Sequence, residues 1–311
     1  MTNSAVWVTI DCRNRMERPL QFSSKSATLK YHKKGALIMR NGHYIIDAHC
    51  HIYPDKIASR AAEAISVFYD GLGFCGGSVS ELLMLMDQQG IDLSLVNSAA
   101  MSPKQVDTIN HFTLNAALEH PDRFVPLGTL HPDTSRQEQA AQIRFLKDNC
   151  YVGIKIHPDM LSINVDDPRM LWIFAQCEEA KIPVLLHTGD CRLDYSNPNR
   201  LEPVAQLFPD LTLIGAHFAG RDFYHEAAER LSRYDNLFCD CSSAFHYMEE
   251  AESLYCLHAY GSHKVMFGTD HPMFCPGEDL DYLFNLDLTE DELADITHRT
   301  AERVFGLPSH D

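Results

Sequence analysis

The sequence lacks several features that mark other classes of protein. It has no run of about 18 apolar residues, so no membrane span is expected, and residues 1–20 contain no apolar stretch that suits a signal peptide. It has no lysine- and arginine-rich block, and its net charge is −17, so no nucleic-acid surface is expected. Its ten cysteines include no CxxC pair, and scattered thiols favour a reducing, cytoplasmic setting.

The composition indicates an ordinary globular protein. Of the 311 residues, 45% are hydrophobic and 22% are charged, which suits a chain with a full-sized core. The acidic charge says nothing about the fold. It does not exclude an anionic substrate either, because a bound cation can dominate the field of a site.

Short β-rich runs alternate with longer segments of helical spacing after residue 42. The eight predicted strands are 43–47, 93–97, 124–129, 153–157, 183–187, 211–217, 236–240 and 264–270. The predicted helices are 80–89, 106–119, 135–149, 168–180, 199–208, 222–234, 248–259 and 288–305, the last with a capping-box pattern at Thr289–Glu292.

Eight alternations predict a (β/α)₈ TIM barrel over residues 42–311, close to the roughly 250 residues that this fold needs. A doubly wound open sheet shows the same alternation, but no Gly-x-Gly-x-x-Gly follows the first strand. Residues 1–41 form an N-terminal extension outside this count. Its AVWVTI and ALIMR segments predict either a small β-hairpin or a flexible arm.

Polar side chains stand where several predicted strands end. His49 and His51, two residues apart, would project from the same strand face. His187, His217 and Asp270 end later strands. The carboxyl ends of all strands of such a barrel open on one face, which carries the active site. Imidazoles and a carboxylate there suit a divalent transition metal.

Other residues near this face have two interpretations each. His157 contacts the substrate or packs at the barrel rim, and Lys155 is structural or faces the substrate. Arg192 and Arg221 hold a substrate carboxylate through the planar guanidinium or are solvated. The glycines of the long loop after the first strand, 71–77, form the hinges of a lid or ordinary turns.

The motifs together resemble the amidohydrolase superfamily, in the branch of metal-dependent TIM-barrel hydrolases and decarboxylases that includes aminocarboxymuconate semialdehyde decarboxylase. The resemblance covers about residues 43–306. It rests on DAHCH at 47–51, GIKIHP at 153–158, LLHTGD at 185–190, AHFAG at 216–220, GTDHP at 268–272 and THRTAERVFGL at 297–307. The last motif has Thr300 where an asparagine is usual.

The resemblance implies roles for the strand-end residues. His49, His51, His187 and Asp270 would be metal ligands. Asp270 would also take a proton from water, and His217 would act as acid or base beside the metal. One ion is favoured over two, because the GIKIHP lysine is not the usual bridge in this branch. Zn²⁺ is the expected ion, with Mn²⁺ as the alternative.

Three functions remain open from the sequence, and the first of them, hydrolysis, is the one that we expect. The first is a metal-dependent hydrolase acting on an amide, lactone or ester bond of a small, carboxylated substrate. The second is a metal-dependent, non-oxidative decarboxylase of an unsaturated or aromatic acid, and the third is a barrel that binds without catalysis. The expected partner is a small molecule, and a homodimer is expected only because dimers are common.

Overall fold

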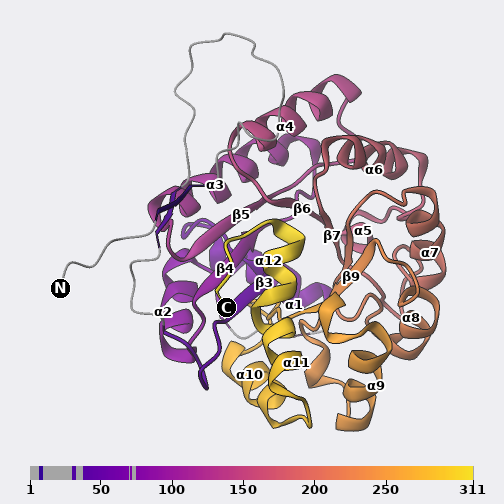
Figure 1. Ribbon diagram of the computed structural model, residues 1–311. Helices are drawn as coiled ribbons and strands as arrows, with labels where there is room; N and C mark the ends of the chain where they lie inside the picture. The colour runs from indigo at the N-terminus through magenta and orange to yellow at the C-terminus, as the bar shows by residue number, and fades with distance from the viewer. Residues whose placement is uncertain (1–6, 10–29, 33–37, 70, 72–74, 311) are drawn as a thin grey trace.

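A computed structural model describes residues 7–9, 30–32, 38–69, 71 and 75–310 (Figure 1). Eight strands form one parallel sheet in the order β3 to β10. They are β3 (Ile46–His51), β4 (Leu93–Asn97), β5 (Phe124–Gly128), β6 (Gly153–Ile156), β7 (Val184–Leu186), β8 (Leu213–Gly215), β9 (Leu237–Asp240) and β10 (Val265–Met266). The backbone N–H of Ala48 donates to the carbonyl of Phe267 at 2.9 Å, and Cys50 forms a parallel bridge with His271. The sheet therefore closes between β3 and β10, and the predicted TIM barrel is confirmed.

Helices connect the strands and surround the sheet, as Figure 1 shows. They are α1 (Ala58–Phe68), α2 (Val79–Gln89), α3 (Val106–Glu119), α4 (Arg136–Asp148), α5 (Pro158–Leu161), α6 (Pro168–Ala180), α7 (Pro198–Leu207), α8 (Tyr224–Leu231), α9 (Glu250–Tyr260), α10 (Pro276–Asn285), α11 (Glu290–Ala294) and α12 (Thr300–Phe305). The sequence did not predict α1, α5 or α10. The helix predicted over 288–305 is interrupted by a π-helical turn, Asp295–Arg299.

The N-terminal extension contributes a separate two-stranded sheet. β1 (Trp7–Thr9) pairs antiparallel with β2 (Lys30–His32). β1 lies within the AVWVTI segment, and its partner strand is Lys30–His32. The ALIMR segment lies partly outside the described residues. The rest of residues 1–37 lies outside the described residues.

Two apolar layers stabilise the barrel. One fills its interior with residues such as Ile46, Leu95 and Leu185, and Phe305 from α12 packs into the same cluster. The other lies between sheet and helices and contains Cys50 and Ile154. The polar strand ends lie beyond the interior layer. In the described part of the chain, no helix is both long and apolar enough to cross a bilayer.

Candidate metal centre

A β-bulge turns both histidines of β3 into the barrel. Ile46 and Ala48 belong to the interior cluster, so strict alternation would send residues 49 and 51 outward. The pairing of β3 with β4 shifts its register between Asp47 and Cys50, and a bulge of this kind re-aims the side chains that follow it. His49 and His51 are buried beside the strand ends. Cys50 lies on the opposite side, in the layer against the helices.

Three of the four predicted ligands form one compact group. The Nε2 atoms of His49 and His51 lie 3.3 Å apart. Asp270 Oδ1 lies 3.4 Å from Nε2 of His49 and 3.2 Å from Nε2 of His51. Metal–ligand bonds of about 2.1 Å in a tetrahedral site separate ligand atoms by about 3.4 Å. The three atoms therefore have the spacing that one divalent ion requires.

The hydrogen bonds behind His49 direct a lone pair at this point. Its Nδ1 lies 3.0 Å from Asp240 Oδ2. Burial raises the pKa of Asp240, but His49, His217 and Ser242 together outweigh this and hold the pKa below its usual value. An ionised carboxylate only accepts, so Nδ1 carries the proton and Nε2 presents its lone pair to Asp270. A carboxylate–histidine pair of this kind commonly supports a metal ligand, and two facing acceptors call for a cation between them.

Lys155, on β6, shares this lone pair. Its Nζ lies 2.8 Å from Nε2 of His49, and the side chain is almost fully buried. Burial lowers the pKa of Lys155 to about 8. An ammonium group and a metal ion would therefore compete for the same nitrogen, and their charges would repel.

His187 and His217 form a hydrogen-bonded chain beside the compact group. Nδ1 of His217 lies 2.8 Å from the carbonyl oxygen of Ser242, which only accepts, so this nitrogen carries the proton. Nε2 of His217 then accepts from Nδ1 of His187 at 3.1 Å. This leaves a lone pair on Nε2 of His187, the tautomer that a metal ligand needs. The structure does not bring His187 into the group of His49, His51 and Asp270, and its ligand role stays a prediction.

Tyr69, which follows the last residue of α1, extends this chain of hydrogen bonds. Its hydroxyl lies 2.9 Å from Nε2 of His157 and 3.3 Å from Nε2 of His187. Nδ1 of His157 accepts from the backbone N–H of Met160, so its Nε2 donates to Tyr69, and Tyr69 donates to His187. The rings of His157 and His187 stack 3.9 Å apart with a 9° angle. Parallel rings do not aim two lone pairs at one point, so these two histidines are poorly placed to share an ion.

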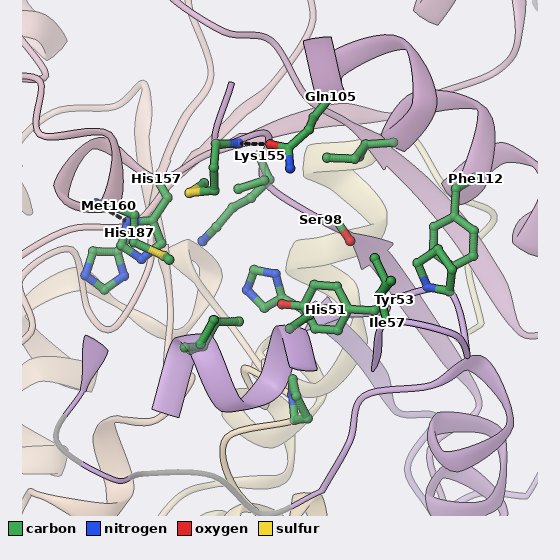
Figure 2. A pocket seen from close by; sticks show the side chains of 18 of the residues that line it. His51, Tyr53, Ile57, Ser98, Gln105, Phe112, Lys155, His157, Met160 and His187 are labelled. Atoms are coloured by element: carbon green, nitrogen blue, oxygen red, sulfur yellow. Dashed lines mark hydrogen bonds between the residues drawn. The ribbon is translucent and has the colours of Figure 1, made fainter. Parts of the chain in front are cut away.

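A cavity of about 450 Å³ opens next to the metal group (Figure 2). His51, Lys155, His157, His187 and Asp270 line one end of it. His157 therefore lies where its predicted substrate contact requires. His217 does not line the cavity and reaches it only through His187.

Neither predicted arginine lines this cavity. Arg192 forms a salt bridge with Asp190, with Nη2 2.7 Å from Oδ2. Arg221 stacks over the ring of Tyr69, with 4.5 Å from its guanidinium carbon to the ring centroid. Tyr69 itself lines the cavity. Lys155 lines the end of the cavity that holds the metal group, and the substrate contacts of the arginines stay predictions.

Sequence reasoning missed two residues of this site. Asp240 is the last residue of β9 and lies between Cys239 and Cys241. The strand-end argument that selected His187 could have selected Asp240 too. Tyr69 had no such signal, because it follows a helix that was interpreted as part of a long loop.

The comparison with known families agrees with this geometry. The profile of a family described as Amidohydrolase matches residues 46–307. The chain belongs to this amidohydrolase family. It is therefore an enzyme of the amidohydrolase superfamily, and the superfamily and the group of His49, His51 and Asp270 support a divalent metal. The predicted family is confirmed. No functionally curated protein matches the sequence significantly.

Solved structures show the same fold at low sequence identity. An uncharacterized TIM-barrel protein of Bordetella bronchiseptica has a TM-score of 0.72 and 23% identity, over 85% of this chain and 99% of that one. 5-Carboxyvanillate decarboxylase of Sphingomonas paucimobilis has a TM-score of 0.65 and 16% identity, over 85% of this chain and 99% of that one. A third structure is a dihydroxybenzoic acid decarboxylase of a Polaromonas species with bound manganese and the inhibitor 2-nitroresorcinol. It has a TM-score of 0.64 and 14% identity, over 85% of this chain and 97% of that one.

Proposed function

We propose that this amidohydrolase-family enzyme is a metal-dependent, non-oxidative decarboxylase of an unsaturated or aromatic acid. The observation that carries the proposal is the composition of the cavity. One end holds the metal group and the cation Lys155, and apolar side chains such as Ile65 and Phe112 line the remainder. Two of the similar folds described above are also decarboxylases of aromatic acids.

This arrangement can bind a carboxylate and assist its loss. A divalent ion held by His49, His51 and Asp270 would supply Lewis-acid polarisation of substrate oxygens. Lys155 would pair with the carboxylate, because an ionised group is costly to bury unless it is paired. Release of neutral CO₂ leaves an electron pair on the carbon, which must then take a proton.

Acid–base side chains are placed to deliver that proton. Asp270 lines the cavity, and Ser243 Oγ holds its Oδ2 at 2.9 Å. His187 lines the cavity too, and His217 contacts it from behind at 3.1 Å. We assign proton transfer to Asp270, which would first take a proton from solvent because an ionised carboxylate has none to give. His217 would position His187 by accepting a hydrogen bond from its Nδ1. The donor set of two imidazoles and one carboxylate suits a single Zn²⁺, and Mn²⁺ is the alternative because the Polaromonas enzyme carries it.

One observation favours hydrolysis as a second candidate. Asp270 belongs to the metal group and also faces the cavity. A carboxylate in this position can accept a proton from an attacking water and pass it to a leaving group. The bond would be an amide, a lactone or another ester.

Product analysis in D₂O separates the two candidates. The zinc- or manganese-loaded protein is incubated with arylcarboxylic acids, with and without alkyl substituents, and with matched aryl esters, lactones and amides. Decarboxylation predicts CO₂ together with one deuterium at the carbon that lost it. Cleavage of the esters, lactones or amides with no CO₂ from any acid would contradict the decarboxylase proposal. Cys50→Ala is the matched control, because its thiol lies on the opposite side of β3.

A further inference from the structure

The apolar part of the cavity is built from one face of α1 and one face of α3. Ile57, Ala61, Ala64 and Ile65 line it from α1 and the residue before that helix. Their spacing of three and four residues places them on one side of the helix. Ile109 and Phe112 of α3 line the cavity too, and Figure 2 shows Phe112 on the far side from His157 and His187. An apolar helix face that would normally meet the core thus lines open space.

Few charged side chains line this space. Among the described residues that line it, the side chains of Lys, Arg, Asp and Glu type are Lys155 and Asp270 at the metal group and Lys104 next to α3. The other lining side chains are mostly aliphatic and aromatic and include three methionines, Met101, Met160 and Met273. Ser98, Gln105 and Thr108 add neutral polar groups. Methionine side chains adapt to ligands of different shape. The walls therefore suit a flexible apolar group, and Lys104 is the one lining side chain of a charged type among the described residues outside the metal group.

The volume exceeds what a small aromatic acid requires. An apolar cavity of about 150 Å³ already accommodates benzene, whereas this cavity measures about 450 Å³. One benzene ring would fill about a third of it. A small acid would leave most of the apolar surface facing water, and that surface contributes to binding only when a ligand covers it.

We propose that the substrate is a carboxylic acid, or an acyl compound that yields one, with an extended apolar tail of the alkyl or arylalkyl type. The head group lies at His51, Lys155 and Asp270, and the tail runs between α1 and α3 towards Phe112. The position of the head group rests on the proposed metal-dependent function. The position of the tail rests on the cavity walls alone.

Calorimetric titration of the zinc-loaded protein tests this with straight-chain carboxylates. The series runs from acetate through butanoate, hexanoate and octanoate to decanoate. Burying a methylene contributes about 0.8 kcal/mol, so affinity should rise about fourfold per added carbon until the cavity is filled. An affinity that does not change with chain length would overturn the proposal.

Cavity-filling variants locate the tail. Ala61→Phe should weaken octanoate binding at least tenfold and leave acetate binding and zinc content unchanged, and Ala64→Phe should act in the same direction. Val67→Phe is the matched control, because Val67 lies on α1, is 73% exposed and does not line the cavity. If both Ala61→Phe and Ala64→Phe bound octanoate with wild-type affinity, the proposal would also be overturned.

The two proposals fail separately. If chain-length dependence is observed and Ala61→Phe removes it, the tail site stands even when no CO₂ release or hydrolysis is found. If short acids are turned over and chain length does not affect binding, the decarboxylase stands and the tail site is wrong.

Discussion

At the scale of the residue, the metal group depends on side chains that never reach the ion. Asp240 Oδ1 accepts from the backbone N–H groups of His217 and Ser242, both at 3.1 Å. Its Oδ2 accepts from His49 Nδ1. One buried carboxylate thus fixes both the tautomer of His49 and the backbone that carries His217.

The first prediction concerns this carboxylate. In Asp240→Asn the backbone N–H groups would keep the amide oxygen, so the NH₂ group would face Nδ1 of His49. Two donors would then oppose each other, and metal affinity should fall about 10- to 100-fold, as for other partners of metal-bound histidines. Chelator competition measures the affinity. Cys50→Ala should retain wild-type affinity, and equal affinity in both variants would show that Asp240 does not orient His49.

The second prediction concerns Lys155. If its ammonium competes with the ion for His49, Lys155→Met should bind the metal more tightly at neutral pH while losing activity. The same chelator competition, with elemental analysis, gives affinity and stoichiometry. A variant that no longer holds metal would instead make Lys155 a ligand or a modified bridge, and one ion per chain would no longer be favoured.

At the scale of the element, irregular segments place the functional groups. The bulge in β3 turns two histidines inward. After β8, three successive residues from His217 to Ala219 have φ between 52° and 59°. This tight left-handed turn brings Ala219 against Gly215, where an added Cβ would lie 2.4 Å from the Cβ of Ala219. Without the bulge in β3, or without the turn after β8, the histidines that these segments carry would not reach the site.

The third prediction concerns α10, which carries the buried Asp279 in its first turn. Burial raises the pKa of Asp279 to about 6, and Nε2 of His246 lies 3.0 Å away. The folded state holds this proton more tightly than the unfolded state. The free energy of unfolding should therefore fall by roughly 3 kcal/mol as pH rises from about 4 to 6, and change little through this group above that range.

Asp279→Asn should remove this part of the pH dependence. The variant and the wild type should unfold at similar denaturant concentrations at pH 4, and the variant should be the more stable at pH 7. If the free energies of unfolding of the two proteins changed with pH in the same way across this range, Asp279 would ionise normally in the folded state.

At the scale of the whole molecule, the barrel was predictable because its signals are local and repeated. α3 and α6 occupy the ranges predicted from their spacing, 106–119 and 168–180. The strand-end argument found His49, His51 and Asp270, because a parallel barrel brings every strand end to one face. Three features depend on long-range packing, and no local sequence pattern predicts them. They are the bulge in β3, the position of Tyr69 and the apolar face of α1. The same limit explains why the sequence left Arg192 and Arg221 open between holding a substrate carboxylate and being solvated.

Metal analysis tests the central claim most directly. Protein purified without added chelator should contain about one divalent ion per chain. Because an ion that binds only the folded state stabilises it, EDTA should lower the unfolding temperature, and Asp270→Asn should lose most of the ion. Less than about a tenth of an ion per chain, together with an unfolding temperature that EDTA does not change, would contradict the metal-dependent account.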